Sequence, residues 1–578
     1  MSKVIISAIV FILVCETSNG QVPSPKREVR AVWIATVAGL DWPKSYDPVD
    51  QQRSLREMAD KLHSAHFNTI FFQVRGRADA MYRSEYEPWA QQLTGTHGKD
   101  PGWDPLAFII QESHDRGMEI HAWFNTFLVK NGNSRPPESQ PRHVILSHPE
   151  WVHLVKGEWW IDPGIPEARN YTVDVALDLV RKYDIDGVHF DFIRYPGDQF
   201  PDQTTYQLYG TGQSRGDWRR DNVNKFVRLF YDEAVKIKPM LKVGSAPIGI
   251  YDRESGEIGL HSYDQLFQDS RRWLRDAKHD YLTPQVYWSL GRKPGNPDFG
   301  ALARDWSRHS YGRHVYLGIA AYKQDVFHEI PELIDTSRFY GVTGNSFFRY
   351  EHISKMLDVG MRYRCLANVP PMRWKDSLPP NPPAGLKVTD DGDGIFQLEW
   401  RPPSNARDGD GAKLYDIYRS IQHPVNIDDP KNLIAIILSN TSLYTDTIRH
   451  PIAVKYFYAV TALDKGNNES LPTNEGAIVV PEIVQLSKRF SDELKLRQSY
   501  PEPASDFVYF SYALKGSSPV WIEILDGSNR EVTRVVDAIQ SQGEYVAGAN
   551  ISNLKEGVYT YQLIAGNTTM RRSMTVKR

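Results

Sequence analysis

The sequence reads Asp186-Gly187-Val188-His189-Phe190-Asp191-Phe192-Ile193-Arg194-Tyr195-Pro196 at the point that decides the fold. Successive residues of a strand face opposite sides, so Val188, Phe190 and Phe192 share one face. His189 and Asp191 share the other face with Gly187. A carboxylate and an imidazole on a buried face cost about several kcal/mol unless they are paired or solvated. We therefore expect His189 and Asp191 to face a polar cavity.

Seven further apolar runs surround this one, and helix-like stretches separate most of them. The eight runs are Val29–Thr36, Phe67–Val74, Met118–Phe124, Gly187–Ile193, Leu241–Ala246, Tyr281–Trp288, His314–Ala320 and Gly341–Phe348. The helix-like stretches include Ser54–Ala65, Pro105–Arg116, Ile165–Lys182, Asp221–Ile237 and Tyr263–Ala277. This alternation predicts an α/β fold, a (β/α)8 barrel of the TIM type. An open doubly wound sheet is the alternative, but Thr36–Trp42 lacks the Gly-rich phosphate turn usual after its first strand.

The N-terminus predicts export. Residues 1–20 read as a signal peptide, with Lys3 before an apolar run that is too short to span a bilayer. A lipidated Cys15 is the alternative. No later segment is apolar enough for a membrane helix, and a formal charge of -3 gives no reason to expect a nucleic-acid partner. We expect a protein of the periplasm, the cell surface or the medium.

We assign the barrel to residues 27–375. Two all-β units are predicted after it. A Pro-rich linker at Pro379–Pro383 precedes short strands over residues 380–482, which resemble a fibronectin type III domain. Residues 498–578 resemble the C-terminal sorting domain of the type IX secretion system, although Glu502 stands where that family usually has Asn. This resemblance implies the secretion machinery as a partner. The alternative is a small β-sandwich without an address function.

Polar and aromatic side chains gather at the predicted strand ends, where a (β/α)8 barrel carries its catalytic groups. Carboxylates, amides, Arg and flat aromatic rings together suit a sugar, because polar groups bond hydroxyls and rings stack on C–H faces. The candidates for catalysis are Asp191, Asp79, Asp162 and Glu351. The candidates for substrate binding are Gln73, Arg75, Trp123, Asn125, His189, Arg194, Gln285, Tyr287, Trp288 and Arg349.

Each acidic candidate also has a structural explanation. Asp191 could pair with a neighbouring Arg, and Asp79 could cap the loop that follows the second strand. Asp162 could form the turn before the next helix, and Glu351 could complement a helix dipole. His189 is about equally suited to the core and to the site. No His-x-x-x-His, paired-Cys or Gly-x-Ser-x-Gly pattern accompanies these acids, so we expect neither a metal, nor a cofactor, nor a serine nucleophile.

Ordered blocks over about Arg27–Met372 resemble the glycosyl-hydrolase-like family 10. They include Trp33-Ile34-Ala35-Thr36-Val37, Leu40-Asp41-Trp42-Pro43, Phe72-Gln73-Val74-Arg75, Asp79-Ala80-Met81-Tyr82, His121-Ala122-Trp123-Phe124-Asn125, Asp162-Pro163-Gly164, Pro284-Gln285-x-Tyr287-Trp288 and Phe348-Arg349. The resemblance implies a (β/α)8 barrel that is related to bacterial cell-envelope glycosidases and hydrolyses glycans. It leaves the particular glycan open.

We therefore expect an exported glycoside hydrolase that acts on a cell-envelope or extracellular polysaccharide, with peptidoglycan-type strands as the first candidate. The reaction needs one protonated and one ionised carboxyl group. We expect Asp191 to be the ionised group, and Asp79 ranks ahead of Asp162 and Glu351 for the other. A barrel that binds glycan without cleaving it is the alternative. The linker also predicts that residues 21–375 fold alone.

Overall fold

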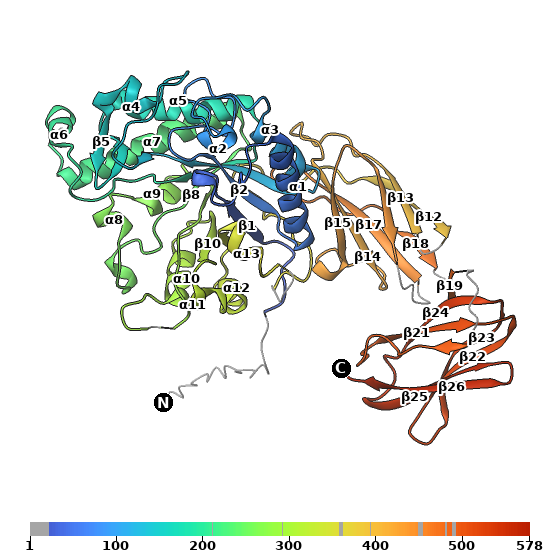
Figure 1. Ribbon diagram of the computed structural model, residues 1–578. Helices are drawn as coiled ribbons and strands as arrows, with labels where there is room; N and C mark the ends of the chain where they lie inside the picture. The colour runs from blue at the N-terminus through green and yellow to red at the C-terminus, as the bar shows by residue number, and fades with distance from the viewer. Residues whose placement is uncertain are drawn as a thin grey trace, which may run out of the picture.

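The computed structural model describes residues 22–210, 212–291, 293–357, 362–392, 395–448, 455–479, 483–487 and 493–578. The expected signal peptide and Cys15 lie outside these residues. The described chain forms a barrel, a middle β domain and a last β domain in chain order (Figure 1). No helix within the described ranges is long and apolar enough to cross a membrane.

The first unit is a closed barrel of parallel strands, as predicted. Its strands follow one another around the barrel in chain order, so each strand pairs with its neighbours in sequence. They are β1 (Val29–Ile34), β2 (Thr69–Arg75), β3 (Glu119–Asn125), β7 (Gly187–Asp191), β8 (Lys242–Ser245), β9 (Tyr281–Leu282), β10 (His314–Ala320) and β11 (Gly344–Phe348). Their carboxyl ends therefore meet at one mouth.

Helices cover the outside of this barrel. Side-chain caps fix several of their starts, because Asp47, Asp104, Ser214 and Asp298 each accept a hydrogen bond from a backbone N–H of the first turn. The longer helices are α1 (Pro48–Ser64), α3 (Pro105–His114), α5 (Pro166–Lys182), α7 (Arg215–Ile237), α10 (Phe299–Arg308) and α12 (Ile330–Phe339). The shorter ones are α2 (Gln91–Thr94), α4 (Val144–Ser147), α6 (Gln203–Tyr209), α8 (Ser262–Gln265), α9 (Ser270–Arg275), α11 (Gln324–Phe327) and α13 (Tyr350–Ile353).

Two predicted elements are shorter than their apolar patterns. The run Tyr281–Trp288 forms a strand only at β9, since Pro284 has no N–H to give to a ladder. Gln285 beyond it makes single bridges to Ile248 and Gly318. The stretch Tyr263–Ala277 is divided between α8 and α9, and Phe267 between them has a left-handed backbone with φ 56°.

A small antiparallel sheet interrupts the chain between β3 and α5, in the loop that leaves the mouth of the barrel. Its strand order is β4 (Leu128–Asn131), β6 (Glu158–Ile161), β5 (Val152–Val155). Backbone bonds from Thr126 to Asp191 and from Ile161 to Phe127 tie this sheet to the ends of β3 and β7. The sheet thus adds side chains to the mouth that no barrel strand supplies.

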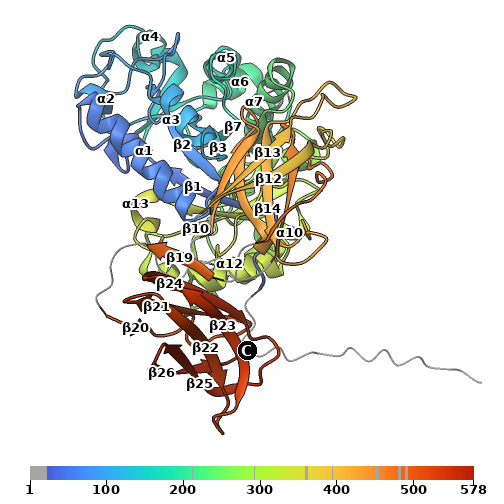
Figure 2. The ribbon, with the colours of Figure 1, turned by 90° about the vertical axis from the view of Figure 1, so that its right-hand side faces the viewer.

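The middle domain is a β-sandwich, residues 384–479 as described. One sheet has the order β12 (Ala384–Gly392), β13 (Ile395–Arg401), β16 (Leu443–Thr447), and the other the order β15 (Leu433–Leu438), β14 (Leu414–Ser420), β17 (Lys455–Leu463), β18 (Gly476–Val479). Trp400, Tyr415 and Ile417 pack in its core. This domain lies between the barrel and the last domain (Figures 1 and 2).

The last domain consists of two four-stranded sheets. Their orders are β19 (Ile483–Ser487), β24 (Gly543–Asn550), β21 (Phe507–Leu514), β20 (Lys495–Leu496), and β23 (Glu531–Gln540), β22 (Ser518–Leu525), β25 (Gly557–Ala565), β26 (Thr568–Val576). Because β19 and β20 belong to the first of these sheets, the domain begins before the boundary at residue 498 that the sequence suggests.

Candidate active site

Asp191 is the last residue of β7 and lies half-buried at the mouth of the barrel. The chain turns sharply after it, because Phe192 adopts a left-handed backbone with φ 49°. This turn brings the Phe192 N–H to 2.7 Å from Oδ1 of Asp191. The Gln285 amide Nε2 lies 3.5 Å from the same oxygen. The local backbone therefore aims the carboxyl group into the mouth.

The environment of Asp191 changes its acidity. Burial raises the pKa of the Asp191 carboxyl to about 6, and the Phe192 N–H, Arg194 and Arg77 oppose this rise. A carboxyl group with this pKa holds a proton in slightly acidic solution, as a general acid must. The sequence predicts Asp191 as the ionised group of the pair, and a pKa of about 6 suits the protonated group as well.

Two guanidinium groups connect Asp191 with other carboxylates. Burial lowers the pKa of Arg77, while the nearby charges of Asp79, Glu158 and Asp191 act in the opposite direction. Burial also lowers the pKa of Arg194, against the charges of Asp191 and Glu158. Glu158 thus shares both cations with Asp191, and Asp79 shares one. Arg77 therefore lies near three carboxyl groups, and Arg194 lies near two of them.

Glu158 and Asp79 reach this region from different elements. Glu158 belongs to β6 of the inserted sheet, where its Oε2 accepts a hydrogen bond of 3.1 Å from the Trp160 indole. Asp79 lies in the loop after β2, and its Oδ1 accepts the Arg77 N–H at 2.8 Å. Both side chains are only partly buried. Each of the two carboxylates is therefore oriented by a hydrogen bond and keeps part of its surface exposed.

Aromatic rings form a wall of the mouth. The Phe348 ring lies 6.2 Å from Trp123, 5.9 Å from Tyr287 and 6.0 Å from Tyr322 between centroids. Tyr287 is close enough to Asp191 for that charge to raise its pKa, although burial is the larger cause. Trp288 is half-buried, with Lys323 Nζ 6.0 Å above its ring. Flat apolar faces of this kind stack on sugar rings.

Buried polar atoms without partners accompany these rings. The indole N–H of Trp159 and the Oδ1 of Asn125 have no hydrogen-bond partner among the described residues, while the Trp123 indole lies close enough to Asp191 to oppose the rise of its pKa. Asn125 pairs directly with Asp191 across β3 and β7, and its Nδ2 donates to the Gly76 carbonyl at 2.9 Å. Unpaired buried donors and acceptors are costly, so a site that leaves them open favours a ligand that pairs them.

Several predicted residues support the mouth from below. Arg75 is fully buried, and a bulge between Gln73 and Arg75 turns it away from the predicted face. Its Nε and Nη2 contact Glu87 at 2.7 and 2.6 Å, and Nη1 donates to the carbonyls of Asn125 and Thr126. The sequence predicts Arg75 at the substrate, whereas the structure buries it beneath the mouth, paired with Glu87 and two backbone carbonyls.

Gln73 and His189 are also committed to the protein. Gln73 Oε1 accepts the N–H groups of Thr36 and Val37 at 3.0 and 2.9 Å, which shapes the loop after β1. His189 is fully buried and uses both ring nitrogens, with Trp33 Nε1 at 3.0 Å and Tyr281 Oη at 3.1 Å. Asp191 therefore lies half-buried at the mouth, while His189 belongs to the core beneath it, so the two side chains do not share one polar environment as the sequence predicts.

Asp162 is fully buried away from solvent. Its Oδ1 accepts the Gly164 N–H at 2.8 Å, and its Oδ2 accepts the Thr205 hydroxyl at 2.7 Å. His153 Nε2 lies 3.6 Å from Oδ2. These contacts match the turn-forming explanation, so the structure separates Asp162 from the acids around Arg77.

Arg349 and Glu351 form a rim on the β11 side. Arg349 Nη1 contacts Asp41 Oδ1 at 2.6 Å and Glu351 Oε2 at 2.8 Å. The hydrogen bond and charge of Arg349 lower the pKa of Glu351, which is exposed. Glu351 therefore remains ionised in neutral solution, outside the cluster that surrounds Asp191.

Sequence reasoning missed Arg77 and Glu158. Arg77 stands two residues before Asp79, in the same loop after β2. Glu158 belongs to a short strand outside the barrel pattern, and its signal is the neighbouring pair Trp159-Trp160 before Asp162. Only the folded position of β6 brings Glu158 to the same cations as Asp191.

Known proteins with this sequence pattern define the class. Residues 28–331 match the family described as Glycosyl hydrolase-like 10. The Glycosyl hydrolase YngK of Bacillus subtilis (strain 168) is 35% identical over 479 residues, which cover 77% of this chain and 92% of that protein. The Glycosyl hydrolase DigH of Escherichia coli (strain K12) is 34% identical over 324 residues, 51% of this chain and 73% of that protein. The chain belongs to the glycosyl hydrolase-like 10 family.

The end of the chain matches a second family. Residues 498–577 match the Secretion system C-terminal sorting domain, as the sequence suggested. Among solved structures, the endo-beta-1,4-mannanase from Thermotoga petrophila is 9% identical, with 96% of this chain and 98% of that chain covered and a TM-score of 0.37. A likeness this distant bears on neither mechanism nor substrate.

Proposed function

We propose that the protein is an exported glycoside hydrolase in which Asp191 is the general acid. The observation that carries this proposal is the raised pKa of Asp191, about 6, at the mouth of the barrel beside two guanidinium groups. Asp191 gives its proton to the glycosidic oxygen as the bond from that oxygen to the anomeric carbon breaks. Membership of a glycosyl hydrolase-like family supports this reaction class.

The second carboxyl group is Glu158 or Asp79, and we place Glu158 first because it shares both Arg77 and Arg194 with Asp191. In its ionised form it either attacks the anomeric carbon or takes a proton from the attacking water. A carboxyl separation of about 5 Å belongs to retention, and about 6.5–9.5 Å to inversion.

The substrate proposed is a glycan of amino sugars, with peptidoglycan-type strands first among cell-envelope polysaccharides. An acetamido group offers one carbonyl acceptor and one N–H donor. The indole N–H of Trp123, beside Asp191, and the Oδ1 of Asn125, which lacks a partner in the described chain, are the complementary donor and acceptor. The rings of Tyr287 and Trp288 supply faces for the sugar.

The sorting domain supports a partner in the secretion machinery. We propose that residues 1–20 direct export and that the last domain is then read by that machinery, which places the enzyme at the cell surface or in the medium. We also propose that the middle domain is a fibronectin type III domain, which its three strands packed on four support.

The competing function is a barrel that binds glycan without cleaving it. Denuded peptidoglycan, native peptidoglycan and common polysaccharides should be incubated with the full chain and with its Asp191→Asn variant, and new reducing ends counted. Asp174→Asn is the matched control, because Asp174 is exposed on the outer helix α5. Release of reducing ends by wild type and control, but not by Asp191→Asn, supports hydrolysis. Pull-down of glycan without release by any form favours the binding barrel.

A further inference from the structure

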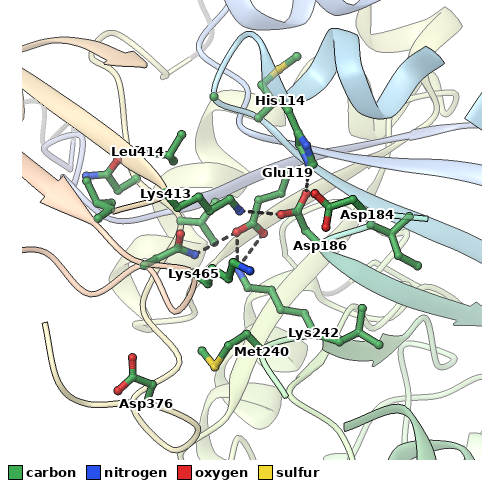
Figure 3. Close-up of a pocket in the computed structure, with 18 of the residues that line it drawn as sticks. His114, Glu119, Asp184, Asp186, Met240, Lys242, Asp376, Lys413, Leu414 and Lys465 are labelled. Atoms are coloured by element: carbon green, nitrogen blue, oxygen red, sulfur yellow. Dashed lines mark hydrogen bonds and ion pairs between the residues drawn. The ribbon is translucent and has the colours of Figure 1, made fainter. Parts of the chain in front are cut away.

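A cavity of about 610 Å³ lies between the N-terminal end of the barrel and the middle domain, at the opposite end from Asp191 (Figure 3). Its walls carry ion pairs between the two domains. Lys413 Nζ of the middle domain lies 2.6 Å from Asp186 Oδ1 of the barrel. Buried ion pairs of this kind are costly to separate, since each partner is left as an unpaired charge.

A second contact across this boundary reaches the floor of the barrel. The Asn467 Nδ2 of the middle domain donates to Glu119 Oε1 at 3.0 Å, and both residues are buried. Lys242 Nζ contacts the two oxygens of Glu119 at 2.6 and 2.7 Å. Burial raises the pKa of Glu119, but the charge of Lys242, the hydrogen bond from His121 and the charge of Lys413 together outweigh it and hold the pKa well below its usual range. Glu119 is therefore ionised.

Hydrogen bonds lead from Glu119 along the barrel interior toward the mouth. His121 Nε2 lies 3.2 Å from Glu119 Oε2, and His121 Nδ1 lies 2.8 Å from the Tyr281 hydroxyl. Tyr281 lies 3.1 Å from His189 Nδ1, and Trp33 Nε1 lies 3.0 Å from His189 Nε2. Glu119 and His121 belong to β3, and Trp33, His189 and Tyr281 belong to β1, β7 and β9.

The residues at the two ends of this hydrogen-bond series, Trp33 and Glu119, fix the direction in which each hydrogen bond is donated. The Trp33 indole can only donate, so His189 Nε2 accepts and His189 carries its proton on Nδ1. The His189 Nδ1–H donates a hydrogen bond to the Tyr281 hydroxyl, and that hydroxyl donates to His121 Nδ1. His121 therefore carries its proton on Nε2, and this N–H donates to the ionised Glu119 carboxylate. Burial lowers the pKa of both His121 and His189, so both rings are neutral, as this direction requires.

The upper end of the chain supports the candidate active site. His189 is two residues before Asp191 on β7. The Trp33 ring packs 5.8 Å from Phe348, the ring that contacts Trp123 and Tyr287. If the hydrogen bonds of this series change direction, the His189 and Trp33 side chains move. That movement shifts Asp191 on the same strand and the aromatic rings that pack on Trp33.

We infer that the middle domain is a positioning element of the active site, in which Asn467 holds the ionised end of the chain from Glu119 to Trp33. The inference rests on the proposed function for its kinetic consequence only. It gives the middle domain a role at the opposite end of the barrel from the substrate.

Two substitutions of Asn467 in the full chain separate this role from packing. Asn467 has a left-handed backbone with φ 62°, which Asp and Gly both tolerate. Asn467→Asp keeps the size and places a second carboxyl group beside Glu119, so the pair takes up a proton. Asn467→Gly removes the amide and leaves Glu119 with Lys242 and His121. We expect Asn467→Asp to lower kcat about 10-fold or more with little change in KM, and Asn467→Gly to lower it less.

The matched control is Asn529→Gly, since Asn529 also has a left-handed backbone, with φ 58°, but is exposed in the last domain. Nitrogen NMR of ¹⁵N-histidine-labelled protein gives a readout independent of activity. Wild type and control should show His121 protonated on Nε2, with the signal assigned from His121→Gln. Asn467→Asp should lose that tautomer.

The outcomes are separable. If wild type cleaves no glycan, the proposed function fails, and the His121 tautomer still tests the inference. An unchanged His121 tautomer in Asn467→Asp overturns it. A greater loss of kcat in Asn467→Gly than in Asn467→Asp also overturns the inference, because that order shows that Asn467 acts by filling space and not by orienting Glu119.

Discussion

The pH dependence of hydrolysis tests the protonation state of Asp191. Because kcat/KM reports the free enzyme, it should follow the protonated fraction of a carboxyl group with a pKa of about 6. That fraction is about nine-tenths at pH 5 and about one-hundredth at pH 8, from the titration of a single group. We therefore expect kcat/KM to fall about 100-fold between pH 5 and pH 8.

The assay is initial release of reducing ends from the polysaccharide that wild type cleaves best, with substrate well below KM. Circular dichroism at each pH checks that the fold is kept. Arg194→Met should move the alkaline limb to higher pH, because Arg194 lowers the pKa of Asp191. A profile that is flat above pH 6 and falls below it would contradict a protonated Asp191, since it assigns Asp191 to the base or nucleophile.

The remaining predictions concern the second acid, the support of the mouth and the last domain. Glu158→Gln should lower kcat at least about 100-fold and Asp79→Asn less, measured under the same assay, and the reverse order would make Asp79 the partner of Asp191. Glu87→Gln should lower the free energy of unfolding of the barrel by about 3–5 kcal/mol in urea denaturation, because it leaves buried Arg75 unpaired; an unchanged midpoint would contradict this. Deletion of residues 483–578, which removes every strand of the last domain, should leave kcat unchanged but retain the protein in the periplasm, as fractionation would show. Truncated protein in the medium would argue against an address function.

Much of the fold follows from local pattern. The eight apolar runs are long enough, and spaced evenly enough by helices, to define a closed parallel barrel. Exceptions arise where backbone chemistry interrupts a pattern, as at Pro284, which ends the ladder after β9. The inserted sheet β4–β6 was not expected, because its strands are short and antiparallel and do not belong to the barrel repeat.

The site was harder to predict than the fold. From sequence, the face on which a strand side chain lies can be inferred only from strict alternation, and irregular strands break that alternation. Asp191 follows the pattern, whereas a single bulge in β2 turns Arg75 to Glu87 and away from the mouth. Asp162 and His189 are polar and well placed in sequence, yet their partners Thr205 and Trp33 are distant in the chain. Glu158 needs the folded sheet to reach Arg77 and Arg194.

Domain independence is the other point at which sequence and structure lead to different expectations. The Pro-rich linker predicts that residues 21–375 fold alone. Lys413 and Asn467 nevertheless complete buried contacts of Asp186 and Glu119. We therefore expect the isolated barrel to be less stable than the barrel within the full chain, because it exposes these acids without their partners.

The most direct test of the central claim is the rate of glycan hydrolysis by Asp191→Asn in the full chain, measured as reducing ends released from denuded peptidoglycan or from the best substrate found. Asp174→Asn is measured beside it. A neutral amide of the same size cannot give a proton to the leaving oxygen, so we expect Asp191→Asn to lose at least about 100-fold of the rate with the fold intact. Turnover by Asp191→Asn close to that of wild type would contradict it.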